Sequence, residues 1–152
     1  MMAVALAAVS CNTQKKEQGN PFFADWKTPF GLPPSDQIRN EHYLPAIDSG
    51  IALARLQIAE ITGNEEAPTF ANTVAKYDRA DELLSRVAAV FYSQTSASTN
   101  DTLEALQMEI APKVSAFSDE VLLNAELFGR IKSVWETRDS SALNAEELFL
   151  LD

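Results

Sequence analysis

A long amphipathic stretch between Pro68 and Thr95 sets the strongest condition on how this chain can fold. Apolar residues recur in it at steps of three and four, which places them on one face of an α-helix. Pro68 ends the preceding element, Thr69 is a suitable N-cap, and no glycine or proline follows before the Ser/Thr-rich run 93–99. The pattern predicts one unbroken helix that needs partners to cover its apolar face. That face is formed by Phe70, Val74, Tyr77, Ala80, Leu84, Val87 and Phe91.

The sequence before this stretch predicts a first helical partner. Residues 41–62 carry a second apolar stripe with helical spacing, and Pro45 is tolerable there because it lies in the first turns. Gly50 lies inside this helix, where a glycine costs about 1 kcal/mol relative to alanine, and a close helix crossing would explain its presence. Gly63 ends the helix, and the short connection to Thr69 predicts an antiparallel helical hairpin.

The sequence after the Ser/Thr-rich run predicts three more helices. One opens with capping-box spacing at Asp101 and extends to about Leu123, with a kink expected at Pro112. Another is expected over 125–138, and a last one starts after an N-cap at Asn144. No alternating strand pattern of useful length is present. The chain is therefore expected to be all-α, with long antiparallel helices.

The first twenty residues are expected to be an export signal and tether rather than part of the fold. Residues 1–10 are uncharged and mostly apolar, and they are followed by Cys11. This order is typical of a bacterial lipoprotein signal, although Ala8 stands where leucine is usual. The polar segment 12–20 suits a flexible tether. The sequence thus predicts an exported protein, periplasmic or attached to the membrane through a lipidated Cys11, with a cytoplasmic protein as the alternative.

Residues 21–40 are expected to form a strap before the helical domain 41–152. The strap is rich in proline and aromatic residues, and proline disfavours regular helices and sheets. Aromatic side chains are costly to leave in water, so we expect them to lie in a groove between helices. A ligand-binding surface is the alternative use.

Composition and residue counts exclude several functions. The net charge of -10 argues against a nucleic-acid partner, because binding to phosphates requires clustered basic residues. The chain contains one histidine, His42, and one cysteine, Cys11, so it does not supply the ligands of a hydrolytic zinc site. His42 is expected to pack or hydrogen-bond at a helix start. We find no Gly-x-Ser-x-Gly motif and no glycine-rich phosphate loop. The sequence therefore predicts no catalytic, cofactor-binding or metal-binding residue in this chain.

Several segments together resemble a known family. The stretch from Trp26 to Pro34, followed by His42 to Ile47, is similar to the start of bacterial peptidyl-dipeptidases, which are thimet oligopeptidase-like zinc metallopeptidases. Pro68 to Thr73 resembles that family's Pro-Thr-Phe-Glu-Asn-Thr, with Ala71 in place of the glutamate. The resemblance covers about residues 20–152. Smaller matches are Leu84 to Val87, Thr99 to Asp101 and Glu109 to Pro112.

The resemblance implies a larger parent protein. Family members are mostly helical, with two halves around a deep cleft, and a zinc ion held in the C-terminal half by His-Glu-x-x-His and a downstream glutamate. In the family a zinc-bound water attacks the peptide carbonyl. None of these residues lies in this chain, so none is carried over. We expect the last helix to be cut short at Asp152, which fits an N-terminal piece of such a protein.

Three interpretations follow from the sequence. The first is the N-terminal helical part of an exported zinc peptidyl-dipeptidase that hydrolyses short peptides, in which this chain forms part of the cleft wall and is inactive without the C-terminal half. The second is a stand-alone, lipid-anchored helical binding module. The third is a remnant of a pseudo-peptidase.

Overall fold

The computed structural model describes residues 19–151, so Cys11 and the expected export signal lie outside the described residues. Helices are the only regular elements in this described range, which confirms the predicted all-α class. No helix in it is both long and apolar enough to cross a membrane. The α-helices are α1 Asn40–Thr62, α2 Ala75–Asp78, α3 Glu82–Ala97, α4 Asp101–Leu122, α5 Ala125–Glu136 and α6 Ala145–Leu151. Shorter elements are a π-helical turn, Phe70–Val74, and 3-10 turns at Pro21–Phe23, Pro29–Gly31 and Arg138–Ser140.

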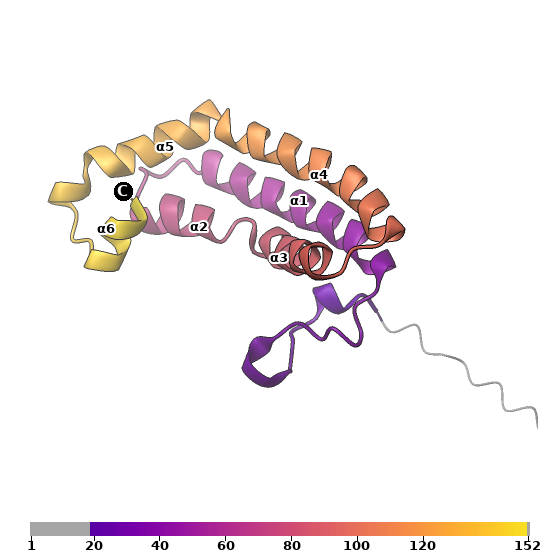
Figure 1. Ribbon diagram of the computed structural model, residues 1–152. Helices are drawn as coiled ribbons and strands as arrows, with labels where there is room; N and C mark the ends of the chain where they lie inside the picture. The colour runs from indigo at the N-terminus through magenta and orange to yellow at the C-terminus, as the bar shows by residue number, and fades with distance from the viewer. Residues whose placement is uncertain (1–18, 152) are drawn as a thin grey trace, which may run out of the picture.

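Helix α1 is the central element of the molecule. It lies between α4 on one side and α2 and α3 on the other (Figure 1). α2 runs back alongside α1, which confirms the predicted antiparallel hairpin, and α5 continues the direction of α4. α6 folds back toward the start of α2. The 3-10 turns of the strap lie beside the opposite end of α1, so the two ends of the described range lie at opposite ends of the molecule.

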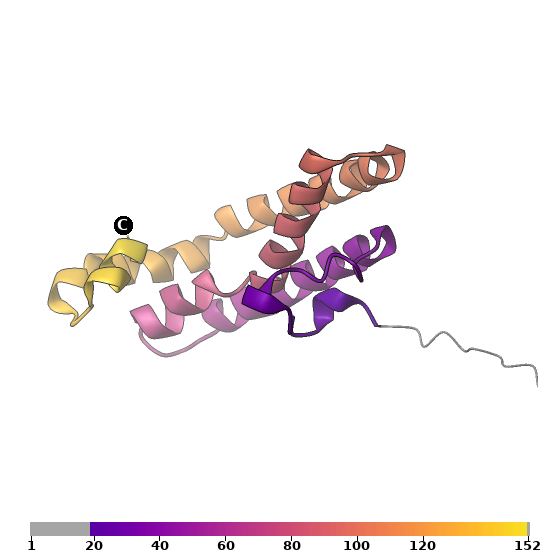
Figure 2. The ribbon, with the colours of Figure 1, turned by 60° about the horizontal axis from the view of Figure 1, so that its bottom comes forward.

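The predicted single helix over the amphipathic stretch is wrong. Thr69 does cap its start, because the Thr69 hydroxyl accepts a hydrogen bond from the Asn72 amide at 3.1 Å. The chain then forms the π-helical turn and α2, breaks at residues 79–81, and resumes as α3. Figure 2 shows that α3 turns steeply away from the line of α2. This turn brings the backbone of α3 close to Gly50 of α1. A Cβ atom at Gly50 would lie 2.9 Å from both Cα and N of Leu84 in α3. The expected close helix crossing at this glycine is therefore confirmed.

The first part of the strap packs against α1 and α3, as predicted. Phe22 is fully buried, and its ring centroid lies 5.5 Å from that of Tyr43, which in turn lies 5.1 Å from Phe91. Arg86 of α3 donates a hydrogen bond to the Phe22 carbonyl at 2.7 Å and lies over the Trp26 ring. Burial in this cluster raises the pKa of the Tyr43 hydroxyl. The aromatic residues thus join the strap to both long helices.

The second part of the strap departs from the prediction. Phe30 is 100% exposed and has a φ of 60°, in the left-handed region that non-glycine residues rarely adopt. The Thr28 hydroxyl donates to the Leu32 carbonyl, and the Gly31 amide donates to the Thr28 carbonyl at 3.1 Å. These bonds close a small loop that holds Phe30 away from the helices. The expectation that every strap aromatic would be covered is therefore wrong for Phe30, and also for Phe23, which is 54% exposed.

Helix α4 differs from the prediction at its N-cap. Its N-cap is Asn100 rather than Asp101, because the Asn100 side chain accepts from the amides of Thr102 and Leu103, both at 3.1 Å. Pro112 lies inside this continuous helix, and the expected kink there stays a prediction. The cap at Asn144 before α6 is confirmed by bonds that its side chain accepts from the amides of residues 146 and 147.

Polar contacts fasten the outer helices to α1. The Arg55 guanidinium forms a two-pronged pair with the Glu120 carboxylate, with N–O distances of 2.7 to 3.1 Å. Lys113 pairs with Asp48 at 2.7 Å. In α5, Arg130 donates to the carbonyl of Asn64 at 2.7 Å, so it ties α5 to the connection that follows α1.

Candidate functional site

Possible metal ligands do not cluster in the described part of the chain. No group of three or more His, Cys, Asp or Glu side chains between residues 19 and 151 could hold a metal ion. His42 acts as predicted at the start of α1, where its Nδ1 accepts a hydrogen bond from the Arg39 amide at 3.0 Å. Cys11, the expected lipidation site, lies outside the described residues. A zinc ion therefore does not fit the residues that the structure describes, and we derive no chemical step through one.

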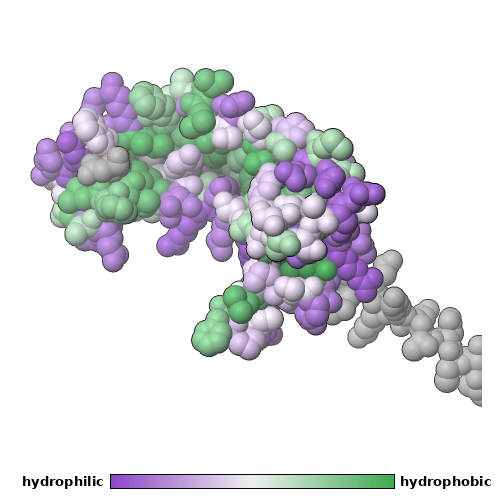
Figure 3. Space-filling model, viewed as in Figure 1, coloured by the Kyte–Doolittle hydropathy of each residue, from purple (hydrophilic) through white to green (hydrophobic). Residues whose placement is uncertain are grey.

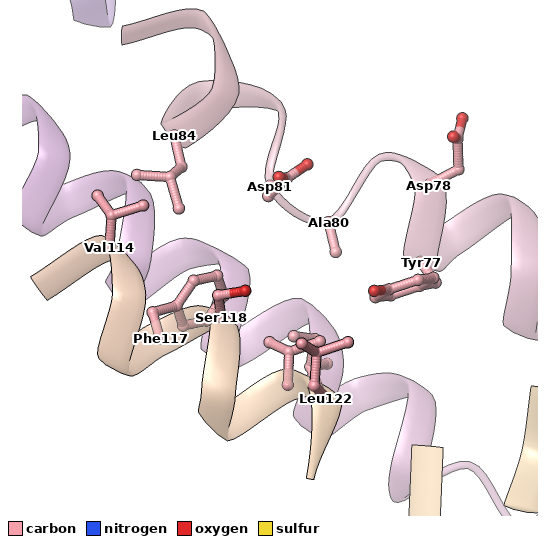
Figure 4. A pocket seen from close by; sticks show the side chains of 11 residues that line it. Tyr77, Asp78, Ala80, Asp81, Leu84, Val114, Phe117, Ser118 and Leu122 are labelled. Atoms are coloured by element: carbon pink, nitrogen blue, oxygen red, sulfur yellow. The ribbon is translucent and has the colours of Figure 1, made fainter. Parts of the chain in front are cut away.

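A groove beside α1 is the site best suited to binding. It has a volume of about 400 Å³ and lies between α4 and the α2–α3 segment, with Ile58 of α1 in its floor. Figure 4 shows Tyr77 and Leu84 on one wall facing Phe117 and Leu122 on the other. Its lining residues are Ile58, Tyr77, Asp78, Ala80, Asp81, Leu84, Val114, Phe117, Ser118, Val121 and Leu122.

The break between α2 and α3 and the packing on α1 together create this groove. The α2–α3 segment packs on α1, and so does α4, but these two walls make few contacts with each other. Tyr77, Val114 and Val121 stay half-buried along this space, whereas Leu84 and Phe117 are already buried, at 4% and 6% exposure. Leu122, at the end of α4, remains 74% exposed because no described element covers this space.

The polar groups of the groove lie along its edge. Asp78 and Asp81 stand on the α2–α3 side, with their carboxylates turned away from α4 (Figure 4). Asp81 accepts a hydrogen bond from the Ser85 hydroxyl at 2.8 Å, whereas no described residue forms an ion pair with Asp78. Ser118 is exposed on the α4 side. The arrangement can hold an apolar group while attracting a positive charge to one edge.

Sequence reasoning missed this groove. The stripe that includes Tyr77 and Leu84 was expected to be covered by neighbouring helices, and an unbroken helix would have left no gap. The only local signal is the acidic pair Asp78 and Asp81, which brackets the break within an otherwise regular helical pattern.

A second apolar surface lies at the α5–α6 end. Figure 3 shows apolar residues gathered over this part of the molecule. Leu123 is 82% exposed, Phe128 64% and Phe149 85%. Large exposed apolar surfaces on soluble proteins commonly mark contacts with other protein.

Comparison with known proteins finds similarity to longer proteins. No protein-family profile matches the chain. The chain is 38% identical over 133 residues to proteins named dipeptidyl carboxypeptidase from Escherichia coli (strain K12) and from Salmonella typhimurium (strain LT2). The match covers 88% of this chain but 20% of each relative, so the chain spans about one fifth of the length of these relatives. As its motifs predicted, the chain is similar over 88% of its length to part of a peptidyl-dipeptidase.

Proposed function

We propose that this chain is the N-terminal helical part of a peptidyl-dipeptidase that hydrolyses short peptides. The observation that carries the proposal is the 38% identity over 133 residues to two dipeptidyl carboxypeptidases. In this role the chain is not catalytic, and the reaction takes place in a C-terminal half that supplies the zinc site. The proposal is supported by the exposed apolar surface at the α5–α6 end, which would pack against that half.

The shape of the chain suits a wall of a peptide cleft. The molecule is arched, with its underside hollowed between the α6 end and the strap loop (Figure 3). A curved helical wall restricts a cleft to short, unfolded peptides because folded proteins do not enter it. The wall role would explain why these residues contribute shape rather than reacting groups.

The proposal also includes export of the protein from the cytoplasm. The apolar segment before Cys11 and the polar tether after it support a periplasmic or membrane-anchored lipoprotein. Globomycin, which blocks lipoprotein signal cleavage, should raise the size of the protein in cells that carry the full gene. An unchanged size in treated cells would remove lipidation from the proposal and leave the peptidase role standing.

The decisive experiment for the peptidase role reads the gene beyond Asp152. We expect the reading frame to continue and to encode His-Glu-x-x-His with a downstream glutamate. An open frame that continues for the length of the relatives without this motif would contradict the proposal. We also expect the 152-residue chain alone to hydrolyse no peptide when zinc is added, because it lacks the ligand set.

A further inference from the structure

We infer that the groove between α2–α3 and α4 is the seat of an amphipathic helix with basic residues along one flank. Three helical walls are already present: α1 forms the floor, and the two sides diverge from it without packing on each other. A fourth helix laid in this space would complete a bundle of four packed helices. Leu122, which is 74% exposed, and the half-buried Tyr77, Val114 and Val121 would then be covered.

The apolar lining of the groove requires an apolar face on the incoming helix. Tyr77 and Leu84 face Phe117 and Leu122 across the groove, and the space between them runs along α4 (Figure 4). A helix that presents apolar side chains at positions i, i+3, i+4 and i+7 matches such a row, as in other helix-in-groove complexes. The groove volume of about 400 Å³ accommodates a few such side chains.

The acidic edge of the groove determines which charges the helix carries along one flank. Asp78 and Asp81 lie on one side of the groove, and no lysine or arginine lines it. Lysine and arginine can lay their apolar stems across the groove wall and place their charged ends at this outer edge. A helix with acidic residues on that flank would be repelled. Charge complementarity therefore selects a helix that is apolar on one face and basic beside it.

The proposed source of this helix depends on the proposed function, because the helix would come from the rest of the peptidase. The relatives are about five times as long as the matched region, so the remainder of a peptidase would have ample sequence to supply it. A second copy of this chain is a poor occupant, because each copy carries a net charge of -10 and would bring more acidic residues to the acidic edge.

Peptide binding to the 152-residue chain tests the inference. The probe is a synthetic helix of about 18 residues, built from Ala, Leu and Lys with leucines at the stated spacing and lysines on one flank. Two comparison peptides have the same composition with scrambled leucines, or glutamate in place of lysine. Affinities are measured by titration calorimetry at low and at physiological salt. We expect the probe to bind about tenfold more tightly than either comparison peptide.

Matched variants locate the binding. Ser118 is exposed in the groove, so Ser118→Trp should fill it without disturbing the core and weaken binding at least about tenfold. Ser96→Trp makes the same change at an exposed site of α3 outside the groove and should have no effect. Asp78→Asn with Asp81→Asn should weaken binding about three- to tenfold at low salt. Glu65→Gln with Glu66→Gln removes the same charge elsewhere and should change affinity less than about twofold.

Each contrary result overturns the inference. Absence of binding, equal affinity for the scrambled peptide, or equal effects of Ser118→Trp and Ser96→Trp would show that the groove seats no helix. Sedimentation of the chain alone provides a further check: a dimer that Ser118→Trp abolishes would assign the groove to a second copy. None of these outcomes bears on the zinc motif beyond Asp152, so failure here is distinguishable from failure of the proposed function.

Discussion

The two ends of α1 differ in how completely they are packed. At the strap end, Phe22, Tyr43 and Phe91 form a buried ring cluster, and nearer the middle of α1 its backbone approaches that of α3 closely at Gly50. At the other end, α5 and α6 leave large apolar side chains such as Phe128 in water. The ring cluster of the first region is buried, whereas Phe128 and Phe149 of the second are 64% and 85% exposed. We conclude that the contacts among the strap, α1 and α3 stabilise this chain, and we propose that the α5–α6 end contacts further protein.

The largest expected effect is loss of an aromatic ring from the packed end. Phe91→Ala should lower the free energy of unfolding by about 3–5 kcal/mol, because Phe91 is fully buried against Tyr43 and its removal leaves a cavity. Phe128→Ala at the open end should change it by less than about 0.5 kcal/mol, since Phe128 is 64% exposed. Urea denaturation followed by circular dichroism measures both. Equal losses of stability would show that the two regions do not differ in packing.

Glycine substitutions test the same contrast with one matched change. Gly50→Ala should destabilise the chain by about 1–3 kcal/mol, because the new Cβ would meet the Leu84 backbone at 2.9 Å. Gly129→Ala, in the interior of α5 with nothing within 4 Å, should stabilise it by about 0.5–1 kcal/mol through helix propensity. Thermal unfolding of both variants should show shifts of opposite sign. A stabilising Gly50→Ala would refute the close crossing.

Loss of the contact between α5 and the connection that follows α1 is expected to have an intermediate effect on stability. Arg130 of α5 donates to the carbonyl groups of Asn64 and Glu66, and Arg130→Met should cost about 1–2 kcal/mol because these carbonyls lose a charged donor. Lys132→Met, on the same helix, removes an exposed pair with Glu136 and should cost less than about 0.5 kcal/mol. Hydrogen exchange should show faster opening of α5 in the first variant. Indistinguishable exchange in the two variants would mean that Arg130 does not fasten α5.

The smallest expected effect is the loss of folding stability at acidic pH. The Arg55 guanidinium beside Glu120 holds the pKa of that carboxyl below its ordinary value of 4.5. The ionised form is therefore favoured in the folded chain, and its contribution to stability is present above the ordinary pKa and lost as pH falls through the lowered one. Both side chains are about half exposed, at 52% and 51%, so the contribution is small. The stability difference between the wild type and Glu120→Gln should shrink on acidification from pH 7, and a widening difference would contradict this pairing.

Much of the packed region could be predicted from the sequence. Gly50 inside an apolar helical stripe indicated the close crossing, and Thr69 and Asn144 were recognisable caps because their chemistry is local. The break at residues 79–81 could not be predicted, because it contains no glycine or proline and follows from where α3 must cross α1. The groove was missed for the same reason. Likewise, nothing local in the strap indicates that Phe30 adopts a positive φ and stays exposed.

The central claim is that this chain shapes a peptidase without performing its chemistry. The most direct measurement is release of dipeptides from the C-terminus of a short peptide, assayed with added zinc for the 152-residue chain and for the full reading frame that contains it. The account predicts zinc-dependent release by the full protein and none by the chain alone. Zinc-dependent release by the 152-residue chain, or none by a folded full protein, would contradict it.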